Sequence, residues 1–293
     1  MRTRLRRLRA AACAGLLGTA LLGLAAGPAS AAAPSGHPST RDYLALGDSL
    51  AAGYQTLPGG GFEVGHGYAQ DLAHTLGGRA QRSGHPFSFT DLGCPGETTG
   101  SMINGGCPFP HPYAGAQLDA AVAYLKAHRG DDVLVTLDIG ANDVDGCATA
   151  QSVDFGCALQ GVAAVGKDTG TILSKLKAAA GPHTRFLAMN LYDPVLADWL
   201  TGSQGRLLAG LSVPLADMLN ATIGLTDARY GVPTVDVAGA FDTNSLLPLV
   251  PLDGQQVPLD VARIMTWTNM ARGDIHANDT GYQVIADTFL ARI

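Results

Sequence analysis

The sequence predicts an α/β fold: a three-layer α/β/α sandwich on a flavodoxin-like, five-stranded parallel sheet. Apolar runs with strand character alternate with stretches of helical spacing, the order typical of a parallel sheet wrapped by helices. The ordinary α/β-hydrolase fold is disfavoured because the chain has no GxSxG turn. Right-handed crossovers between successive strands favour the strand order 2-1-3-4-5.

The strand candidates are short runs dominated by apolar residues. They lie at residues 43–46, 87–92, 133–139, 185–189 and 234–237. Three of them run directly into a glycine-containing turn, as expected where a strand ends.

The helix candidates lie between these strands. They lie at 67–76, 116–127, 158–179 and 207–226, with a last helix from near residue 278. In the third, Leu159, Val162, Leu173 and Leu176 fall near one face, a stripe that indicates core packing.

The first 31 residues have the composition of an export signal. Five arginines precede an apolar stretch from Ala10 to Ala26, and a helix-breaking Gly-Pro and small residues follow. Because this stretch is shorter than the roughly 20 residues of a spanning helix, we expect cleavage after Ala31 rather than a membrane anchor. Residues 32–40 are expected to form a flexible tail, and residues 41–293 a single domain.

The chain without that signal is strongly acidic. Its 262 residues carry 14 Lys and Arg against 25 Asp and Glu, a net charge of −11. This charge disfavours nucleic acid and anionic membranes as partners. We expect no mature segment to span a bilayer, and therefore a secreted, extracellular protein without stable membrane anchoring. No sequence feature fixes the oligomeric state, and we expect a monomer.

Two segments are not explained by the scaffold, at residues 100–115 and 238–273. Ligands of open α/β sheets bind beyond the carboxyl ends of the strands, where such loops gather. Both segments are therefore candidate walls of a substrate groove, or else cover apolar surface. The apolar stretches at 109–113 and 246–252 would suit an acyl chain or a buried loop equally.

Residues with reactive or donor groups follow three strands. Ser49 follows the first, where its hydroxyl would be exposed near the positive end of the next helix. Gly96 follows the second, where its backbone N–H could approach a reacting carbonyl, and Asn142 follows the third with an amide that could bind an oxyanion. The plain alternatives are a helix cap, an ordinary turn and an Asx turn.

A histidine completes this set. His276 follows Asp274 closely and precedes the last helix. Its imidazole could take the proton of Ser49 and return it to a leaving alcohol. Because strand ends and helix starts meet at one edge of such a sheet, the four residues together predict a serine hydrolase.

The blocks LGDSLAAGY, GCPGETT, GANDV and DIHANDTGYQVIA, in this order, resemble the SGNH hydrolases, also called the GDSL lipase/esterase family, and especially its secreted actinobacterial members. The resemblance spans Tyr43 to the C-terminus. It implies that Ser49 is the nucleophile and that its N–H, the Gly96 N–H and the Asn142 amide form the oxyanion hole. His276 becomes the general base and then the acid.

The acid of the triad departs from the family pattern, Asp-x-x-His-Pro. Gly273 occupies the third position before His276, Asp274 the second, and Ala277 replaces the proline. Either Asp274 or a backbone carbonyl near residue 273 is therefore expected to orient the imidazole.

The predicted function is hydrolysis of carboxylic esters, as a lipase or esterase, through an acyl-enzyme on Ser49. The substrate would be a small-molecule or lipid ester, with no cofactor and no metal. Alternatives on the same fold are a polysaccharide O-deacetylase, a phospholipase-type acyl hydrolase, or a non-catalytic binding module. The last is disfavoured because a binding module needs no nucleophile.

Four cysteines remain after Cys13 leaves with the signal. In an exported protein this even number indicates disulfides, with three possible connectivities. The short loops favour Cys94 with Cys107 and Cys147 with Cys157. A zinc site is the alternative, but the chain has no CxxC pair. Such bridges would stiffen the loops that carry the expected oxyanion donors.

Overall fold

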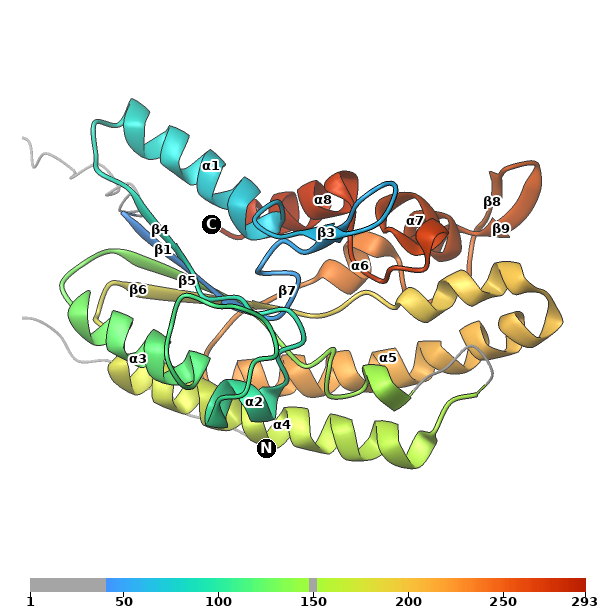
Figure 1. Cartoon of the computed structure of the whole chain (residues 1–293), viewed down its shortest axis with the longest axis horizontal. Coiled ribbons are helices and arrows are strands. Elements are labelled where there is room, and N and C mark those ends of the chain that lie inside the picture. The colour runs from blue at the N-terminus through green and yellow to red at the C-terminus, as the bar shows by residue number, and fades with distance from the viewer. Residues whose placement is uncertain (1–40, 148–151) are drawn as a thin grey trace, which may run out of the picture. The chain divides into compact units, whose positions relative to one another are not determined.

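Five parallel strands form the central sheet of the computed structural model, which describes residues 41–147 and 152–293 (Figure 1). They are β1 (Asp42–Gly47), β4 (Ser88–Asp91), β5 (Val133–Asp138), β6 (Thr184–Met189) and β7 (Thr234–Val235). The spatial order β4-β1-β5-β6-β7 confirms the predicted order 2-1-3-4-5. The expected signal (1–31) and tail (32–40) lie outside the described residues.

Helices cover both faces of this sheet and complete the predicted three layers. Figure 1 shows α1 (Tyr68–Arg82) and α8 (Asp279–Leu290) on one side. On the other side lie α3 (Gln117–Ala127), α4 (Phe155–Ala179) and α5 (Ser203–Arg229). All five correspond to predicted helices, and α1, α4 and α5 extend beyond the predicted ends.

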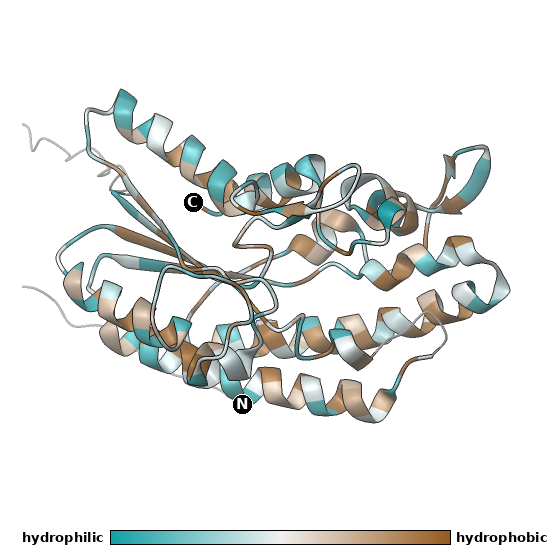
Figure 2. Ribbon diagram, in the orientation of Figure 1, coloured by the Kyte–Doolittle hydropathy of each residue, from teal (hydrophilic) through white to brown (hydrophobic). Residues whose placement is uncertain are grey.

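The alternation of side chains along β1 explains why both faces are covered. Tyr43 and Ala45 belong to the core that includes residues of α1 and α8. Leu44 and Leu46 belong to the core that includes residues of α3 and α4. Because successive side chains of a strand point to opposite faces, a strand that is buried from Tyr43 to Gly47 requires helices on both sides. Figure 2 shows the hydrophobic colour along the central strands.

Several short elements were not predicted. They are β2 (Gln55–Thr56), β3 (Phe62–Glu63), α2 (Thr99–Asn104), η1 (Asp145–Cys147), η2 (Pro194–Thr201), α6 (Val237–Phe241), β8 (Leu249–Leu252), β9 (Gln255–Pro258), α7 (Leu259–Trp267) and η3 (Met270–Arg272). Most are too short to show a hydrophobic period. The segments at 100–115 and 238–273 therefore contain regular structure, including α6, α7 and the β8–β9 hairpin.

The expectation that a helix follows Ser49 is wrong. After β1 the chain makes tight turns, in which the Tyr54 N–H donates to the Ser49 carbonyl (2.9 Å). Gly53 then adopts a left-handed conformation (φ 65°), which breaks a right-handed helix, and the chain enters β2. The first helix, α1, begins only at Tyr68. The surroundings of Ser49 therefore depend on tertiary contacts and not on a helix dipole.

By length and composition α5 could cross a membrane, contrary to the expectation that no mature segment could. Leu208, Leu219 and Ile223 of this helix are nevertheless buried in the fold. Part of its apolar composition therefore serves packing along α4, while Leu207 and Leu225 of the same helix are exposed.

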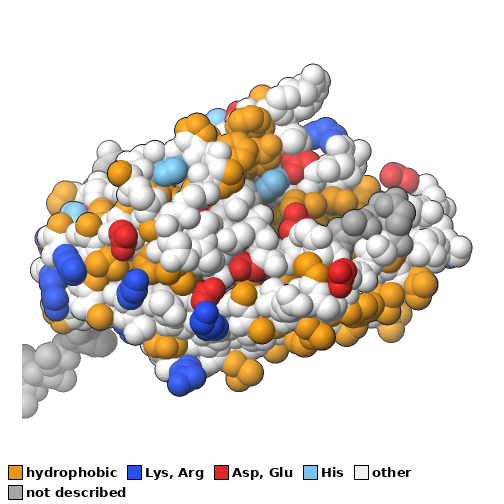
Figure 3. Space-filling model, turned by 60° about the horizontal axis from the view of Figure 1, so that its bottom comes forward, with side chains coloured by type: hydrophobic (Ala, Val, Ile, Leu, Met, Phe, Trp, Pro, Cys, Tyr) orange, Lys and Arg blue, Asp and Glu red, His pale blue; other side chains and the backbone are white. Residues whose placement is uncertain are grey.

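The surface turned forward in Figure 3 carries the acidic character of the sequence. Asp and Glu side chains lie across the middle of this face, while Lys and Arg gather toward one end. Hydrophobic side chains are also exposed, and those with large exposed fractions include Phe62 (51%), Leu207 (56%) and Leu225 (74%).

Candidate active site

Ser49 lies in the turn that leaves the carboxyl end of β1. Ser49 is buried, 8% exposed, whereas the sequence predicts an exposed hydroxyl. Its hydroxyl donates to Asp48 Oδ1 (3.4 Å). The same oxygen accepts the Leu50 N–H (3.0 Å). The turn therefore closes on the carboxyl of Asp48 and presents Ser49 at the sheet edge.

A second buried carboxyl holds this turn from the neighbouring strand. Asp138, the last residue of β5, accepts the N–H groups of Asp48 (3.2 Å) and Ala51 (3.3 Å) on Oδ2. Its Oδ1 accepts the Tyr68 hydroxyl (2.5 Å). The sequence predicts only that Asp138 belongs to a strand, because nothing local marks its contact with the Ser49 turn.

Asp48 and Asp138 are both fully buried and lie side by side. Burial raises the pKa of both carboxyls, and the charge of Asp48 raises the pKa of Asp138 further. Two ionised carboxylates are strongly disfavoured this close together in a buried site. The two carboxyls therefore titrate as one unit, with the pKa of Asp138 raised the more strongly.

The two other strand-end loops meet the Ser49 turn. Gly96 has φ 80°, and a Cβ there would lie 2.9 Å from Pro108 Cγ, so the position requires glycine. Asn142 donates its amide to the Glu97 carbonyl (2.9 Å) and to Asp48 Oδ2 (3.4 Å). The loops after β1, β4 and β5 thus converge, as the sequence predicts for one edge of a parallel sheet.

His276 approaches this edge from the segment before α8. Its Nδ1 lies 2.5 Å from Asp274 Oδ1, which also accepts the His276 backbone N–H (3.2 Å). The carboxyl of Asp274, one of the two alternatives left open by the sequence, is thus placed against the imidazole. The charge of His276 acts on Asp48, the residue before Ser49, and partly offsets the rise that burial causes in the pKa of Asp48.

Asp274 is held in its ionised form. Burial alone would raise its pKa, but the hydrogen bond and charge of His276 and the donors of Thr56 outweigh burial and lower the pKa to about 2. Its Oδ2 accepts the Thr56 N–H (3.1 Å) and hydroxyl (2.8 Å). Thr56 lies in the two-residue strand β2, and no signal in the sequence identified it.

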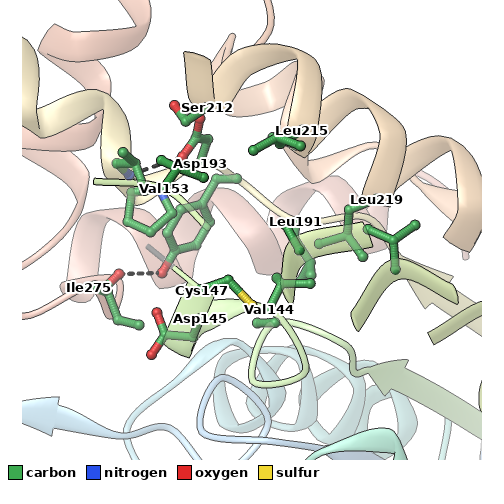
Figure 4. Close-up of a pocket in the computed structure, with 17 residues that line it drawn as sticks. Val144, Asp145, Cys147, Val153, Leu191, Asp193, Ser212, Leu215, Leu219 and Ile275 are labelled. Atoms are coloured by element: carbon green, nitrogen blue, oxygen red, sulfur yellow. Dashed lines mark hydrogen bonds between the residues drawn. The ribbon is translucent and has the colours of Figure 1, made fainter. Parts of the chain in front are cut away.

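A cavity of about 140 Å³ is bordered by residues that adjoin Asn142 and His276 in the chain. Its walls include Ala141 and Ile275, the neighbours of Asn142 and His276. Figure 4 shows Leu191, Leu215 and Leu219 bordering the same space. The Tyr192 hydroxyl donates to the Ile275 carbonyl (2.8 Å) and so fixes the wall nearest His276.

The residues around this cavity differ from those that the sequence suggested. Neither 109–113 nor 246–252 contributes to its lining. The apolar walls come instead from α4, α5 and the segment that follows β6. Packing of the long helices beyond the end of the sheet creates this space, and no local pattern encodes it.

The cysteines pair as the short loops favour. Cys94 is bonded to Cys107 and Cys147 to Cys157, with Cα–Cα distances of 6.3 and 5.4 Å. His111 lies beside the first pair, within 4.8 Å of both sulfurs. A zinc ion would need both sulfurs as free thiolates, but they are bonded to each other, so this cluster is a disulfide.

Comparison with known proteins identifies the family of this chain. The profile of the GDSL-like Lipase/Acylhydrolase family matches residues 45–284. Among curated proteins, none matches this chain.

Several solved structures share the fold. The extracellular lipase of Streptomyces rimosus has 17% identity and a TM-score of 0.55, covering 87% of this chain and 100% of that one. Phospholipase A1 of Streptomyces albidoflavus has 17% identity and a TM-score of 0.51, with the same coverage. An acetylxylan esterase of Geobacillus stearothermophilus has 15% identity and a TM-score of 0.50, covering 86% and 94%. At such identities the likeness shows the fold alone.

Proposed function

Since the chain belongs to the GDSL-like lipase/acylhydrolase family, we propose that it hydrolyses carboxylic esters through an acyl-enzyme on Ser49. The observation that carries this proposal is the contact of Asp274 with His276 Nδ1 at the edge where the loops of Ser49, Gly96 and Asn142 meet. An oriented imidazole beside a serine is the arrangement that activates a hydroxyl nucleophile.

Acylation begins when the Ser49 hydroxyl turns from Asp48 toward His276 Nε2. His276 takes the hydroxyl proton while Oγ forms a bond to the carbonyl carbon of the ester. The N–H groups of Ser49 and Gly96 and the Asn142 amide donate to the resulting oxyanion. The bond between the carbonyl carbon and the alcohol oxygen then breaks, and the proton on His276 passes to that oxygen.

Deacylation repeats these steps with water. His276 takes a proton from water, the hydroxide oxygen attacks the acyl carbon, and the bond to Ser49 Oγ breaks as Oγ regains a proton. Asp274 stays ionised throughout and stabilises the imidazolium, because its pKa lies near 2. The carboxylic acid and a free Ser49 are the products of this half-reaction.

The cavity beside Asn142 and His276 suits the acyl group. Its walls are mostly apolar, with Asp145, Asp193 and Ser212 as polar members, and so favour an acyl chain over a charged group. Its volume of about 140 Å³ is close to that of an engineered cavity of about 150 Å³ that binds benzene. We therefore place acyl chains of roughly four to six carbons there, in keeping with a preference for short to medium acyl esters.

The proposal includes export. Export is supported by the arginine-rich start and the apolar stretch that precede Ala31. It is also supported by the two disulfides, because disulfides persist in oxidising compartments. The mature protein is then a secreted, single-domain monomer of residues 41–293 behind a short tail, of the actinobacterial secreted type, without stable membrane anchoring.

Covalent labelling tests the nucleophile. A fluorescent organophosphate is expected to label the wild type with one equivalent and to leave Ser49→Ala unlabelled, because only an activated serine reacts with it. Thermal melting of both proteins is the control for folding. Labelling that persists in Ser49→Ala would assign the nucleophile to another residue and defeat the proposal.

A further inference from the structure

Three aromatic rings form a cluster beside His276 that the chemistry above leaves unused. The Tyr54 ring lies 4.5 Å from the His276 ring, centroid to centroid. Phe62 stacks on Tyr54 at 5.1 Å, with 18° between the planes. Phe109 meets both rings edge-on, at 6.0 Å from Tyr54 and 5.6 Å from Phe62. We call these three residues the aromatic cluster.

Phe62 of the aromatic cluster is linked to the residues that hold His276. Phe62 on β3 pairs with Thr56 on β2, and Thr56 donates twice to Asp274. The carbonyl of Thr56 in turn accepts from Arg272 Nη2 (3.2 Å). The β2–β3 hairpin therefore cannot shift without disturbing the residue that orients His276.

Phe109 of the aromatic cluster is linked to the loop that carries Gly96. Phe109 follows Pro108, whose Cγ lies 2.9 Å from the position that a Cβ of Gly96 would take. It also follows Cys107, which is bonded to Cys94 at the start of the Gly96 loop. The aromatic cluster therefore extends from the base toward the oxyanion donors, the two groups between which an ester must lie.

Part of the cluster is open to solvent. Phe62 is 51% exposed, and Tyr54 and Phe109 are partly exposed. Aromatic rings stabilise contacts with other rings beyond their buried area. A half-exposed ring stacked on a partner beside a reactive histidine is thus available to a ligand.

The chemistry determines which part of an ester meets this cluster. His276 gives its proton to the alcohol oxygen, so that oxygen must come within hydrogen-bond distance of the imidazole. The acyl cavity is lined by none of the three rings. We propose that Tyr54, Phe62 and Phe109 bind the alcohol portion of the ester and favour alcohols that carry a ring. This inference rests on the proposed function.

Competition between acceptor alcohols during deacylation isolates this subsite. The butyryl-enzyme is formed from p-nitrophenyl butyrate in an equal mixture of benzyl alcohol and 1-pentanol. His276 takes the proton of the acceptor, the alcohol oxygen bonds to the acyl carbon, and Ser49 Oγ leaves with a proton. The ratio of benzyl butyrate to pentyl butyrate is measured by gas chromatography. Because both esters form from one acyl-enzyme, a general loss of activity cancels from this ratio.

The wild type is expected to favour benzyl alcohol. Phe62→Ala and Phe109→Ala are each expected to lower the ratio by roughly threefold to tenfold, the contribution of one aromatic contact. Leu207→Ala, an equally exposed apolar position on α5 (56%), is the matched control and should leave the ratio unchanged. A second mixture, with methyl xyloside in place of benzyl alcohol, distinguishes a sugar ring from an aryl ring. A lower ratio of ring-alcohol ester to pentyl butyrate in the phenylalanine variants, in either mixture, supports the subsite.

Two failures are distinguishable. If the butyryl-enzyme forms and turns over but neither phenylalanine variant changes either ratio, the alcohol does not bind at the aromatic cluster, and this inference is overturned alone. If no butyryl-enzyme forms and Ser49 is not labelled by an organophosphate, the proposed function fails, and the inference fails with it.

Discussion

Asp274 contacts His276 although its spacing from this histidine differs from the pattern of the family. It stands two positions before His276 instead of three, yet its Oδ1 reaches Nδ1 at 2.5 Å. Two hydrogen bonds from Thr56 fix its other oxygen and so determine where the carboxylate points. The altered spacing is therefore accommodated by a partner from a separate hairpin.

Replacing this carboxylate tests its role. Asp274→Asn is expected to lower kcat by at least about a hundredfold, because the amide stabilises neither the imidazolium nor the required tautomer, and the comparable change in a serine protease costs about 10⁴. Steady-state kinetics on p-nitrophenyl butyrate measure the effect, with thermal melting as the folding control. A loss below about tenfold would indicate that a backbone carbonyl suffices to orient His276.

At the scale of elements, η2 begins at a buried acid that also borders the acyl cavity. Asp193 accepts the Val195 N–H (3.0 Å) and the Ser212 hydroxyl (2.5 Å). Figure 4 shows Asp193 beside Ser212 at the cavity. Burial raises the pKa of Asp193 to about 6. The residue therefore caps η2 and is protonated more readily than an ordinary aspartate.

This raised pKa predicts a pH-dependent stability difference. Between about pH 4 and pH 6 the unfolded chain ionises at Asp193 while the folded protein keeps its proton, so the wild type loses stability as pH rises. Asp193→Asn can keep the cap without ionising. Its free energy of unfolding, relative to wild type, should rise across this window by on the order of 2 kcal/mol and then level off. Urea unfolding at pH 4, 5, 6 and 7 measures it, and a difference constant with pH would contradict the assignment.

Helix α5 carries a matched pair of positions for testing the acyl cavity. Leu219 borders the cavity, whereas Leu225 is 74% exposed on the same helix. Leu219→Trp should fill the cavity and lower kcat/KM for butyrate and hexanoate esters by about tenfold or more, the discrimination typical of methylene groups in an apolar pocket. Turnover of p-nitrophenyl acetate reports that the variant has folded. Leu225→Trp should leave the chain-length profile unchanged, and an equal loss on all three esters in Leu219→Trp would argue against this cavity as the acyl subsite.

At the scale of the whole molecule, two disulfides lie beside the loops of the candidate site. Cys94–Cys107 bridges the Gly96 loop to the Phe109 segment, and Cys147–Cys157 ties η1 to α4. Both bridges therefore border loops that meet at the sheet edge.

The exported protein should contain no free thiol. Denatured, unreduced protein purified from the medium is expected to take up no iodoacetamide, and four equivalents after reduction, because Cys13 leaves with the signal. Mild reduction should also lower kcat, since the oxyanion loops lose a covalent restraint. Reduced enzyme that keeps its full kcat and only melts at a lower temperature would restrict the bridges to a structural role.

The sequence by itself determined the scaffold. Strand runs, helical spacing and crossover handedness are local or generic signals, so the five-stranded sheet and its order were predictable. The same locality placed Ser49, Gly96, Asn142 and His276 at strand ends and before a helix, and hence at one edge.

Only the tertiary structure decided how these residues are supported. Thr56 and Asp274 are 218 positions apart, and Asp48 and Asp138 are 90 apart. Such contacts depend on how separate elements pack, and no periodicity or motif encodes a hydrogen bond across that distance. The same reason applies to the acyl cavity between long helices and to the aromatic cluster, whose rings come from two loops. Sequence thus predicts where the chemistry gathers, while packing decides what orients the histidine and what surrounds the ester.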